Sequence, residues 1–140
     1  MRVFICSYSG FSLAIPAEFV SSIFLFNDTA ENNTENYSIY SLPVLIDLPE
    51  LSVRHGVILK KRFNAENIIL LTTEIESETE IPDDNFFPLP KTLVHMRFLQ
   101  FINGIYFNAG KNTKAKTKDL VLLLNPEQLV HNIYQGTSND

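Results

Sequence analysis

The residues best suited to chemistry, three histidines and one cysteine, are scattered along the chain. His55, His95 and His131 fall in three different predicted elements, and none belongs to an HxH or HExxH pattern. Cys6 has no second cysteine with which to form an intramolecular disulfide or a CxxC half-site for zinc. We therefore expect no bound metal. A metal site assembled from distant residues across the fold is the alternative.

Motifs for a nucleophile or for phosphate binding are also missing from the sequence. Ser9, Gly10 and Ser12 do not form a GxSxG elbow, and the five glycines include no Gly-rich phosphate loop. The sequence thus lacks the motifs that a hydrolase or a nucleotide-binding enzyme requires. We therefore expect no catalytic residues and no cofactor. An enzyme would need a pocket in which His55 or His95 meets a Glu or Asp side chain.

The most regular polar pattern is an acidic ladder at residues 74–81, EIESETEI. A strand places every second side chain on the same side, and here those side chains are Glu74, Glu76, Glu78 and Glu80. Because like charges repel, that side should face water or a basic partner. Two interpretations stay open: a charged edge strand that resists aggregation, or a protein-binding edge formed by Glu76, Glu78 and Glu80. Alternating glutamates without an intervening glycine do not form a calcium loop.

The composition is that of one globular domain. A chain of 140 residues, 45% of them hydrophobic and 19% charged, can bury a core without metal or disulfide. Its net charge of −5 argues against nucleic acid or an anionic membrane as partner. No run approaches the roughly 18 apolar residues that span a membrane, and no signal-peptide cleavage site follows the N-terminus. We expect one domain over residues 1–135, a disordered tail over 136–140, and a cytoplasmic location.

Short apolar runs separated by turn residues predict about nine or ten strands. The runs cover residues 2–7, 11–15, 19–26, 37–48, 56–59, 68–73, 74–81, 93–107 and 120–124. The first two form a hairpin with Gly10 at its turn. The polar segments 27–36 and 108–118 are expected to be loops, the second one rich in lysine. This pattern favours an all-β barrel architecture.

Two details of this pattern give specific expectations. Residues 37–62 are interpreted as two strands that turn a corner of a barrel, with Pro43 and Ile46, like Leu123 near the C-terminus, in the core. One short helix should follow Asn125, a good N-cap residue, and extend to about residue 134. Pro126 suits the first helical position, and Glu127 adds negative charge to the first turn.

Three segments, in this order, resemble the CheW-like domain family of chemotaxis coupling proteins. Residues 11–26, FSLAIPAEFVSSIFLF, are similar to the family's opening hairpin, its A-I-P step and the next strand. Residues 42–48, LPVLIDL, resemble its P-V-I-D-L strand. Residues 120–129, LVLLLNPEQL, resemble its apolar strand, capping residue and short helix. The resemblance extends over residues 3–134.

The resemblance implies a fold of two SH3-like five-stranded β-barrel subdomains with a short C-terminal helix. It also implies a non-enzymatic adaptor that bridges chemoreceptor tips and the regulatory domain of a CheA-type histidine kinase, or that binds another CheW-like domain. A CheW-like structural protein that binds a partner outside chemotaxis is the alternative.

The chain departs from the family at the G-V-I-N-x-R-G motif that precedes the P-V-I-D-L strand. Asn36 falls at the family's Asn, but Ser38 stands at its Arg and Ile39 at its Gly. Tyr37, Ile39 and Tyr40 place large side chains here, so we expect these three residues to form part of a protein-binding interface. Because the Arg and Gly of the family's motif are replaced, the sequence leaves open whether receptor coupling of the usual kind is kept.

Overall fold

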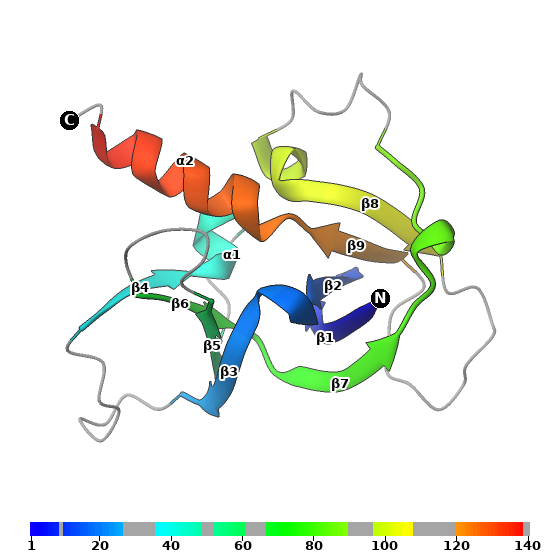
Figure 1. Cartoon of the computed structure of the whole chain (residues 1–140), viewed down its shortest axis with the longest axis horizontal. Coiled ribbons are helices and arrows are strands. Elements are labelled where there is room, and N and C mark those ends of the chain that lie inside the picture. The colour runs from blue at the N-terminus through cyan, green and yellow to red at the C-terminus, as the bar shows by residue number, and fades with distance from the viewer. Residues whose placement is uncertain are drawn as a thin grey trace.

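The structure is a computed structural model of the chain (Figure 1). It describes residues 1–8, 10–26, 36–48, 52–60, 67–89, 97–107 and 120–138, without the side chains of 97, 98 and 134–138. These residues form nine strands in two sheets, followed by a C-terminal helix. The expected all-β fold with a short C-terminal helix is thus confirmed. No helix within the described ranges is long and apolar enough to cross a membrane.

The larger sheet, which we call sheet A, has five strands in the order β7-β1-β2-β9-β8. They are β1 (Arg2–Tyr8), β2 (Phe11–Pro16), β7 (Ile75–Glu80), β8 (Ile102–Phe107) and β9 (Leu120–Leu124). β2 and β9 run parallel, and the other neighbours are antiparallel. Strands from the beginning, middle and end of the chain therefore meet in one sheet.

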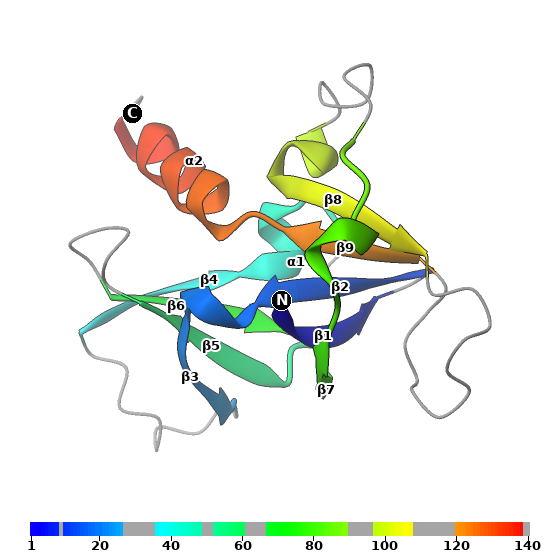
Figure 2. The same cartoon turned by 45° about the vertical axis from the view of Figure 1, so that its right-hand side comes forward.

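The second sheet, sheet B, has four strands in the order β3-β5-β6-β4. They are β3 (Val20–Leu25), β4 (Tyr37–Ser41), β5 (His55–Leu59) and β6 (Asn67–Thr72). A 3-10 turn at Ala17–Phe19 leads from sheet A into sheet B. Figures 1 and 2 show the two sheets as separate units that lie side by side. The resemblance implied five strands per subdomain, and sheet B has four among the residues that the structure describes.

The first hairpin forms where the sequence predicted it. Gly10 has a φ of +88°, a left-handed conformation that glycine adopts without steric cost. The rings of Tyr8 and Phe11, on either side of the turn, stack with centroids 5.5 Å apart. The turn chemistry and this aromatic pair together fix the register, which runs from Val3 opposite Pro16 to Tyr8 opposite Phe11.

The two sheets share a hydrophobic core, to which the C-terminal helix also contributes. Sheet A supplies Leu13 and Ile15, sheet B supplies Val57 and Leu70, and the helix supplies Leu129. Each of these side chains is at most 1% exposed. Burial of a large aliphatic side chain contributes about 1.5–3 kcal/mol, so this shared core is the main force that joins the sheets.

Buried polar groups add a hydrogen-bonded joint between β1 and β6. The Tyr8 hydroxyl lies 2.7 Å from Thr72 Oγ1, and the Thr72 hydroxyl donates to Cys6 Sγ at 3.4 Å. The Cys6 thiol in turn donates to the Leu13 carbonyl oxygen at 3.6 Å. Burial raises the pKa of Cys6 to about 12, so the thiol stays protonated and is a poor nucleophile.

The segment after β4 corrects one prediction. Leu42–Leu45 form α1, a single helical turn, where both the apolar pattern and the resemblance to P-V-I-D-L indicated a strand. Pro43 lies in the first turn, where its missing N–H removes no helical hydrogen bond. The turn is closed by two backbone hydrogen bonds, from Asp47 N–H to the Val44 carbonyl and from Leu48 N–H to the Pro43 carbonyl. This is a Schellman ending, with Asp47 in the left-handed region at φ 65°.

The expected core positions are nevertheless correct. Ile46 is fully buried, Leu123 is 6% exposed, and Pro43 is buried within α1. In β6, Ile68, Ile69 and Leu70 are each at most 1% exposed, as expected for a strand covered on both faces. An apolar run thus predicts burial reliably, whereas the same run does not by itself distinguish a strand from a buried helical turn.

The C-terminal helix, α2 (Pro126–Ser138), begins as predicted. Asn125 Oδ1 accepts a hydrogen bond from the backbone N–H of Gln128 at 3.2 Å, and Pro126 occupies the first helical position. Leu129, Val130 and Ile133 are buried along one face. The helix ends at Ser138, four residues after the expected end near residue 134.

Candidate protein-binding surfaces

Four strands lie at the ends of the two sheets, and each leaves one side unpaired by any described strand. β7 and β8 are the edges of sheet A, while β3 and β4 are the edges of sheet B. Edge strands expose backbone N–H and C=O groups that can pair with another chain. Both sets of predicted binding residues lie on such edges, Tyr37, Ile39 and Tyr40 on β4 and Glu76, Glu78 and Glu80 on β7.

The acidic ladder forms β7 and has the predicted alternation. Glu76, Glu78 and Glu80 are exposed, and the residues between them are half-buried. Glu74 precedes the strand, so only three of the four glutamates belong to it. The prediction of an exposed acidic edge strand is confirmed.

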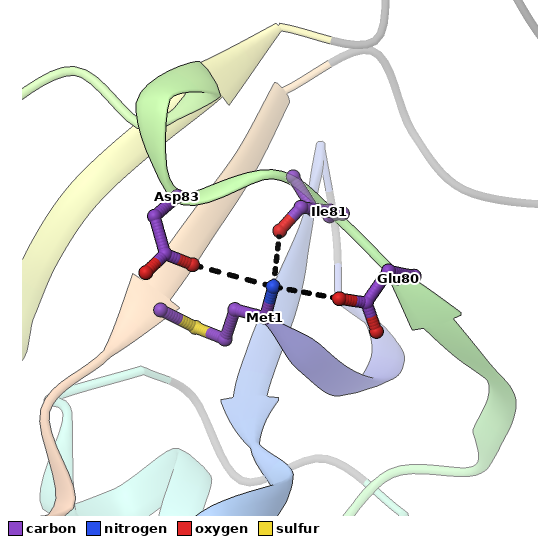
Figure 3. Close-up of polar contacts among 4 residues, drawn as sticks. All are labelled: Met1, Glu80, Ile81 and Asp83. Carbon is purple, nitrogen blue, oxygen red and sulfur yellow. Dashed lines mark hydrogen bonds and ion pairs between the residues drawn. The ribbon is translucent and has the colours of Figure 1, made fainter.

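Each glutamate of β7 has an internal partner on or beside β1. Glu76 Oε2 accepts a hydrogen bond from the Ser7 hydroxyl at 2.9 Å, and Glu78 forms an ion pair with Arg2. The Met1 ammonium donates to Glu80 Oε1 at 2.9 Å (Figure 3). These cross-strand contacts are consistent with a protected edge, because the carboxylates are already engaged by their own sheet.

The Met1 ammonium is held by three oxygen atoms (Figure 3). Besides Glu80, it donates to the Ile81 carbonyl oxygen at 2.9 Å and lies 3.3 Å from Asp83 Oδ1. The hydrogen bond to Glu80 is the main cause of the raised pKa of the amine. This contact ties the start of β1 to the segment that follows β7.

On β4 the three predicted residues divide between the two faces of sheet B. Tyr40 lies on the face that packs against the shared core. Tyr37 and Ile39, two residues apart, lie on the opposite face, where Ile39 is 41% exposed. The structure therefore brings Tyr37 and Ile39 together on one surface and assigns Tyr40 to the packing of the sheet.

That opposite face of sheet B, which we call the outer face, carries apolar residues from all four strands beside the polar residues Ser22, Ser41 and Asn67. In register with Ile39 lie Ile69 of β6 and Ile58 of β5, and the neighbouring row holds Leu71 and Phe24. Phe24, Ile58 and Leu71 are half-buried, and Ile69 at the centre of the face is 1% exposed. The ring of Phe24 lies over Gly56, where an added Cβ would come within 2.3 Å of the ring. The outer face offers an uncharged, partly exposed surface next to the β4 edge.

The histidines and the cysteine do not form a reactive cluster. His55 Nδ1 accepts a hydrogen bond from the Ile75 backbone N–H at 3.0 Å, which places the ring at the junction of β5 and β7. His131 is exposed on α2, and His95 lies outside the described residues. Among the described residues, no group of three His, Cys, Asp or Glu side chains could hold a metal ion.

An open cleft lies where the beginning of β1 meets the ends of β2 and β5. Met1, Arg2, Glu18, Lys60 and Asp83 contribute its charged groups. No histidine of the described part of the chain lines it. His55 therefore does not meet a carboxylate in this cleft, as an enzymatic interpretation of that residue would need, and His95 lies outside the described residues.

Sequence reasoning missed two exposed aromatic residues near the β8 edge. Phe87 and Phe107 are each 60% exposed. Phe87 forms two backbone hydrogen bonds with Ile105, both 2.8 Å, so the segment after β7 covers the middle of the β8 edge. The aromatic pair in the segment PDDNFFPLP had suggested a crossing segment pinned to the core, and only Phe86 of that pair packs inward. The proline-rich pattern of the segment carried no information on which ring would be outside.

The fold has the known architecture that the resemblance of the sequence to the CheW-like family implied. No family model and no curated protein matches the sequence. The structure is similar to the scaffolding protein TtCheW from Thermoanaerobacter tengcongensis, with a TM-score of 0.62 over 88% of this chain and 82% of that one. Sequence identity is 9%, so the likeness is one of fold. The chain has the two-subdomain β fold of a CheW scaffolding protein.

Proposed function

We propose that the chain is a non-enzymatic CheW-like adaptor of the cytoplasm that binds the regulatory domain of a CheA-type histidine kinase, a chemoreceptor or another CheW-like domain. The likeness in fold to a scaffolding protein over 88% of the chain is the observation that carries this proposal. The absence of a reactive cluster among the described residues is consistent with it. Chemotaxis-type signalling is accordingly the proposed setting.

The binding surface is centred on Tyr37 and Ile39. Both lie on the outer face of sheet B next to an open strand edge, and Ile39 is among the exposed large apolar residues. Partly exposed apolar side chains on a strand at the end of a sheet suit recognition through side-chain packing. Tyr40 supports this surface from the core side. Glu76, Glu78 and Glu80 form a second candidate surface, for a basic partner.

Titration calorimetry against the regulatory domain of the CheA-type kinase from the same organism tests the proposal. We expect micromolar affinity, roughly −8 kcal/mol. Tyr37→Ala and Ile39→Ala should weaken binding by about tenfold each, since truncation removes apolar area from the contact. Leu25→Ala, at the other edge of sheet B and 60% exposed, is the matched control and should bind normally.

The acidic surface has its own test. If β7 docks a basic partner, replacing Glu76, Glu78 and Glu80 together by Gln should weaken binding and remove its salt dependence. Thermal unfolding of the same variant measures the loss of the internal contacts to Ser7, Arg2 and Met1. If the triple variant binds the partner as the wild type does, the glutamates of β7 serve to protect the sheet edge from aggregation and do not bind the partner.

If calorimetry detects no heat of binding to the kinase domain, and the protein is shown to be folded, kinase binding is contradicted. Receptor fragments containing the signalling tip are then titrated in the same way. If both fail, the chain is a CheW-like scaffold with a partner outside chemotaxis, and affinity capture with the wild-type chain and the Ile39→Ala variant identifies proteins that need this surface.

A further inference from the structure

The chain returns from sheet B to sheet A through residues 72–75, which we call the crossover segment. It joins the end of β6 to the start of β7. At its beginning, Thr72 Oγ1 lies 2.7 Å from the Tyr8 hydroxyl of β1, so sheet A holds this end. At its other end the backbone N–H of Ile75 donates to His55 Nδ1 of β5 at 3.0 Å. His55 thus ties the first residue of a sheet A strand back to sheet B.

The Ile75 N–H lies where the ladder between β1 and β7 is irregular. Ile5 pairs with Ser77. Cys6 pairs with Ile75, which leaves Glu76 as an extra residue on β7. Such a bulge disrupts the regular backbone hydrogen bonds of a ladder. At this half-buried point a side chain of sheet B serves as the acceptor, so the start of β7 depends on the histidine ring for one of its backbone hydrogen bonds.

This hydrogen bond requires the neutral form of His55. Neutral imidazole carries its proton on one ring nitrogen and accepts at the other, so a ring that accepts at Nδ1 is protonated at Nε2. The imidazolium ion carries a proton on both nitrogens and has no acceptor. A proton bound at Nδ1 would therefore point at the N–H of Ile75 and break the contact. Histidine titrates between about pH 5 and pH 8, and the contact is lost as the pH falls through that range.

The other side chains bonded to the crossover segment do not titrate in that range. Burial raises the pKa of Cys6 to about 12 and also raises the pKa of Tyr8, so both groups stay protonated. The hydroxyl groups of Thr72 and Thr73 remain neutral. Among the described residues that hold this segment, His55 is accordingly the one whose hydrogen bond depends on pH near neutrality.

Few charged groups surround the histidine ring within the described part of the chain. β3 and β6, the strands that flank β5, contain no charged or titratable side chain, and β5 holds no other. Arg54 precedes the histidine, Glu74 precedes β7 and Glu76 is its second residue. All three are exposed, so water and salt screen their effect on the ring. Asp28 and Glu50 lie outside the described residues.

We propose that His55 makes the junction between sheet B and β7 sensitive to pH. While the ring is neutral, it holds the start of β7 to β5. When the ring takes up a proton, the Ile75 N–H is released and the crossover segment loses its link to β5, while β7 keeps its pairing with β1. Protonation thus loosens one link between the two sheets without unfolding either of them. This property goes beyond the proposed adaptor function, because it belongs to the chain alone and requires no partner.

Amide hydrogen exchange in the full chain, measured for each residue by NMR, tests this proposal. After correction for the intrinsic pH dependence of exchange, protection of the Ile75 amide should fall about three- to tenfold from about pH 8 to about pH 5.5, as expected for the loss of one hydrogen bond. The Leu70 amide of the central strand β6 should keep its protection, which separates local release from unfolding of sheet B. Equal losses at both amides, or no loss at Ile75, would overturn the proposal.

Substitutions at His55 show whether the histidine is responsible. His55→Asn keeps an oxygen acceptor close to the position of Nδ1 but does not titrate, so protection of the Ile75 amide should become independent of pH. His55→Phe removes the acceptor and should give low protection at both pH values. His131→Asn, at an exposed position on α2, is the matched control and should retain the pH dependence of the wild type. If His55→Asn loses protection in acid as the wild type does, another group is responsible and the proposal is wrong.

The wild-type chain also allows a direct measurement that does not depend on the folding of a variant. Nitrogen-15 NMR of the histidine rings reports which nitrogen carries the proton. At about pH 8 the His55 ring should be protonated at Nε2 and not at Nδ1. A ring protonated at Nδ1 at this pH cannot accept from Ile75, and this result would contradict the proposal whatever the outcome of the kinase titration.

Discussion

Sheet A is packed on both of its faces, whereas the outer face of sheet B is buried only at its centre, where Ile69 of β6 is 1% exposed. Beyond the shared core, the other face of sheet A buries Val3 and Ile5, which are 0% and 1% exposed. On the equivalent outer face of sheet B, Ile58 and Leu71 are half-buried and Ile39 is 41% exposed. The two sheets have similar apolar content, so the difference lies in what covers them.

The cover of sheet A comes from the segment after β7. Ile81 and Phe86 pack against Val3 and Ile5, and the Met1 ammonium holds that segment in place through the Ile81 carbonyl oxygen and Asp83. In sheet B, Phe24 covers part of the outer face from within the sheet itself. Described segments therefore close both faces of sheet A, whereas sheet B keeps Leu25 and Ile39 exposed on its two edge strands.

A matched pair of substitutions measures this difference. Ile5→Ala removes a fully buried side chain from the closed face of sheet A and should cost about 2–5 kcal/mol of unfolding free energy. Ile39→Ala makes the same chemical change on the outer face of sheet B and should cost less than about 1 kcal/mol, since the site is already open to water. Urea unfolding of both variants gives the two values, and equal losses would show that the outer face is closed in solution.

The joint between the sheets gives the next largest effect. Thr72→Val keeps the shape of the side chain but removes the hydroxyl group that lies 2.7 Å from the buried Tyr8 hydroxyl, so we expect a loss of about 1–3 kcal/mol. Adding Tyr8→Phe removes the Tyr8 hydroxyl as well and should restore part of that loss. Denaturant unfolding of the single and double variants tests both statements.

The control for this joint lies one residue further along the chain. The Thr73 hydroxyl donates to the Ser7 carbonyl oxygen at 2.8 Å in a half-buried position. Thr73→Val should therefore cost less than Thr72→Val, because water can reach the group left behind. The reverse order would mean that the buried chain of hydroxyl and thiol groups does not hold the sheets together.

Local signals in the sequence were sufficient for most of the fold. Gly10 indicated the first hairpin, the Asn125-Pro126 pair indicated the start of α2, and the alternation of residues 75–80 indicated an exposed edge. Each signal depends on a period or on a backbone preference that nearby residues alone determine. The same reasoning failed at α1, because an uninterrupted apolar run has no period from which strand and helix can be distinguished.

The candidate site was only partly predictable, for a different reason. The sequence singled out Tyr37, Ile39 and Tyr40 because they are large, but it could not show that alternation assigns Tyr40 to the core face. Which face of a strand is buried depends on the partner sheet, and that is set by distant residues such as those of β1. The exposed alternation of the β7 carboxylates was predicted correctly, whereas their partners Ser7, Arg2 and Met1 follow from a pairing between distant strands.

The turn that ends α1 gives the smallest expected effect, and it tests why this segment of the sheet B half is helical. Asp47 adopts a φ of 65°, a conformation that costs free energy for a residue with a Cβ and little for glycine. Asp47→Gly should therefore stabilise the fold by about 0.5–1 kcal/mol, and Asp47→Ala, which lacks the local tolerance of Asp and Asn, should destabilise it. Thermal unfolding of both variants measures the difference. If glycine destabilises as alanine does, the left-handed turn at Asp47 does not form, and the strand that the sequence pattern predicted over residues 42–48 would be restored.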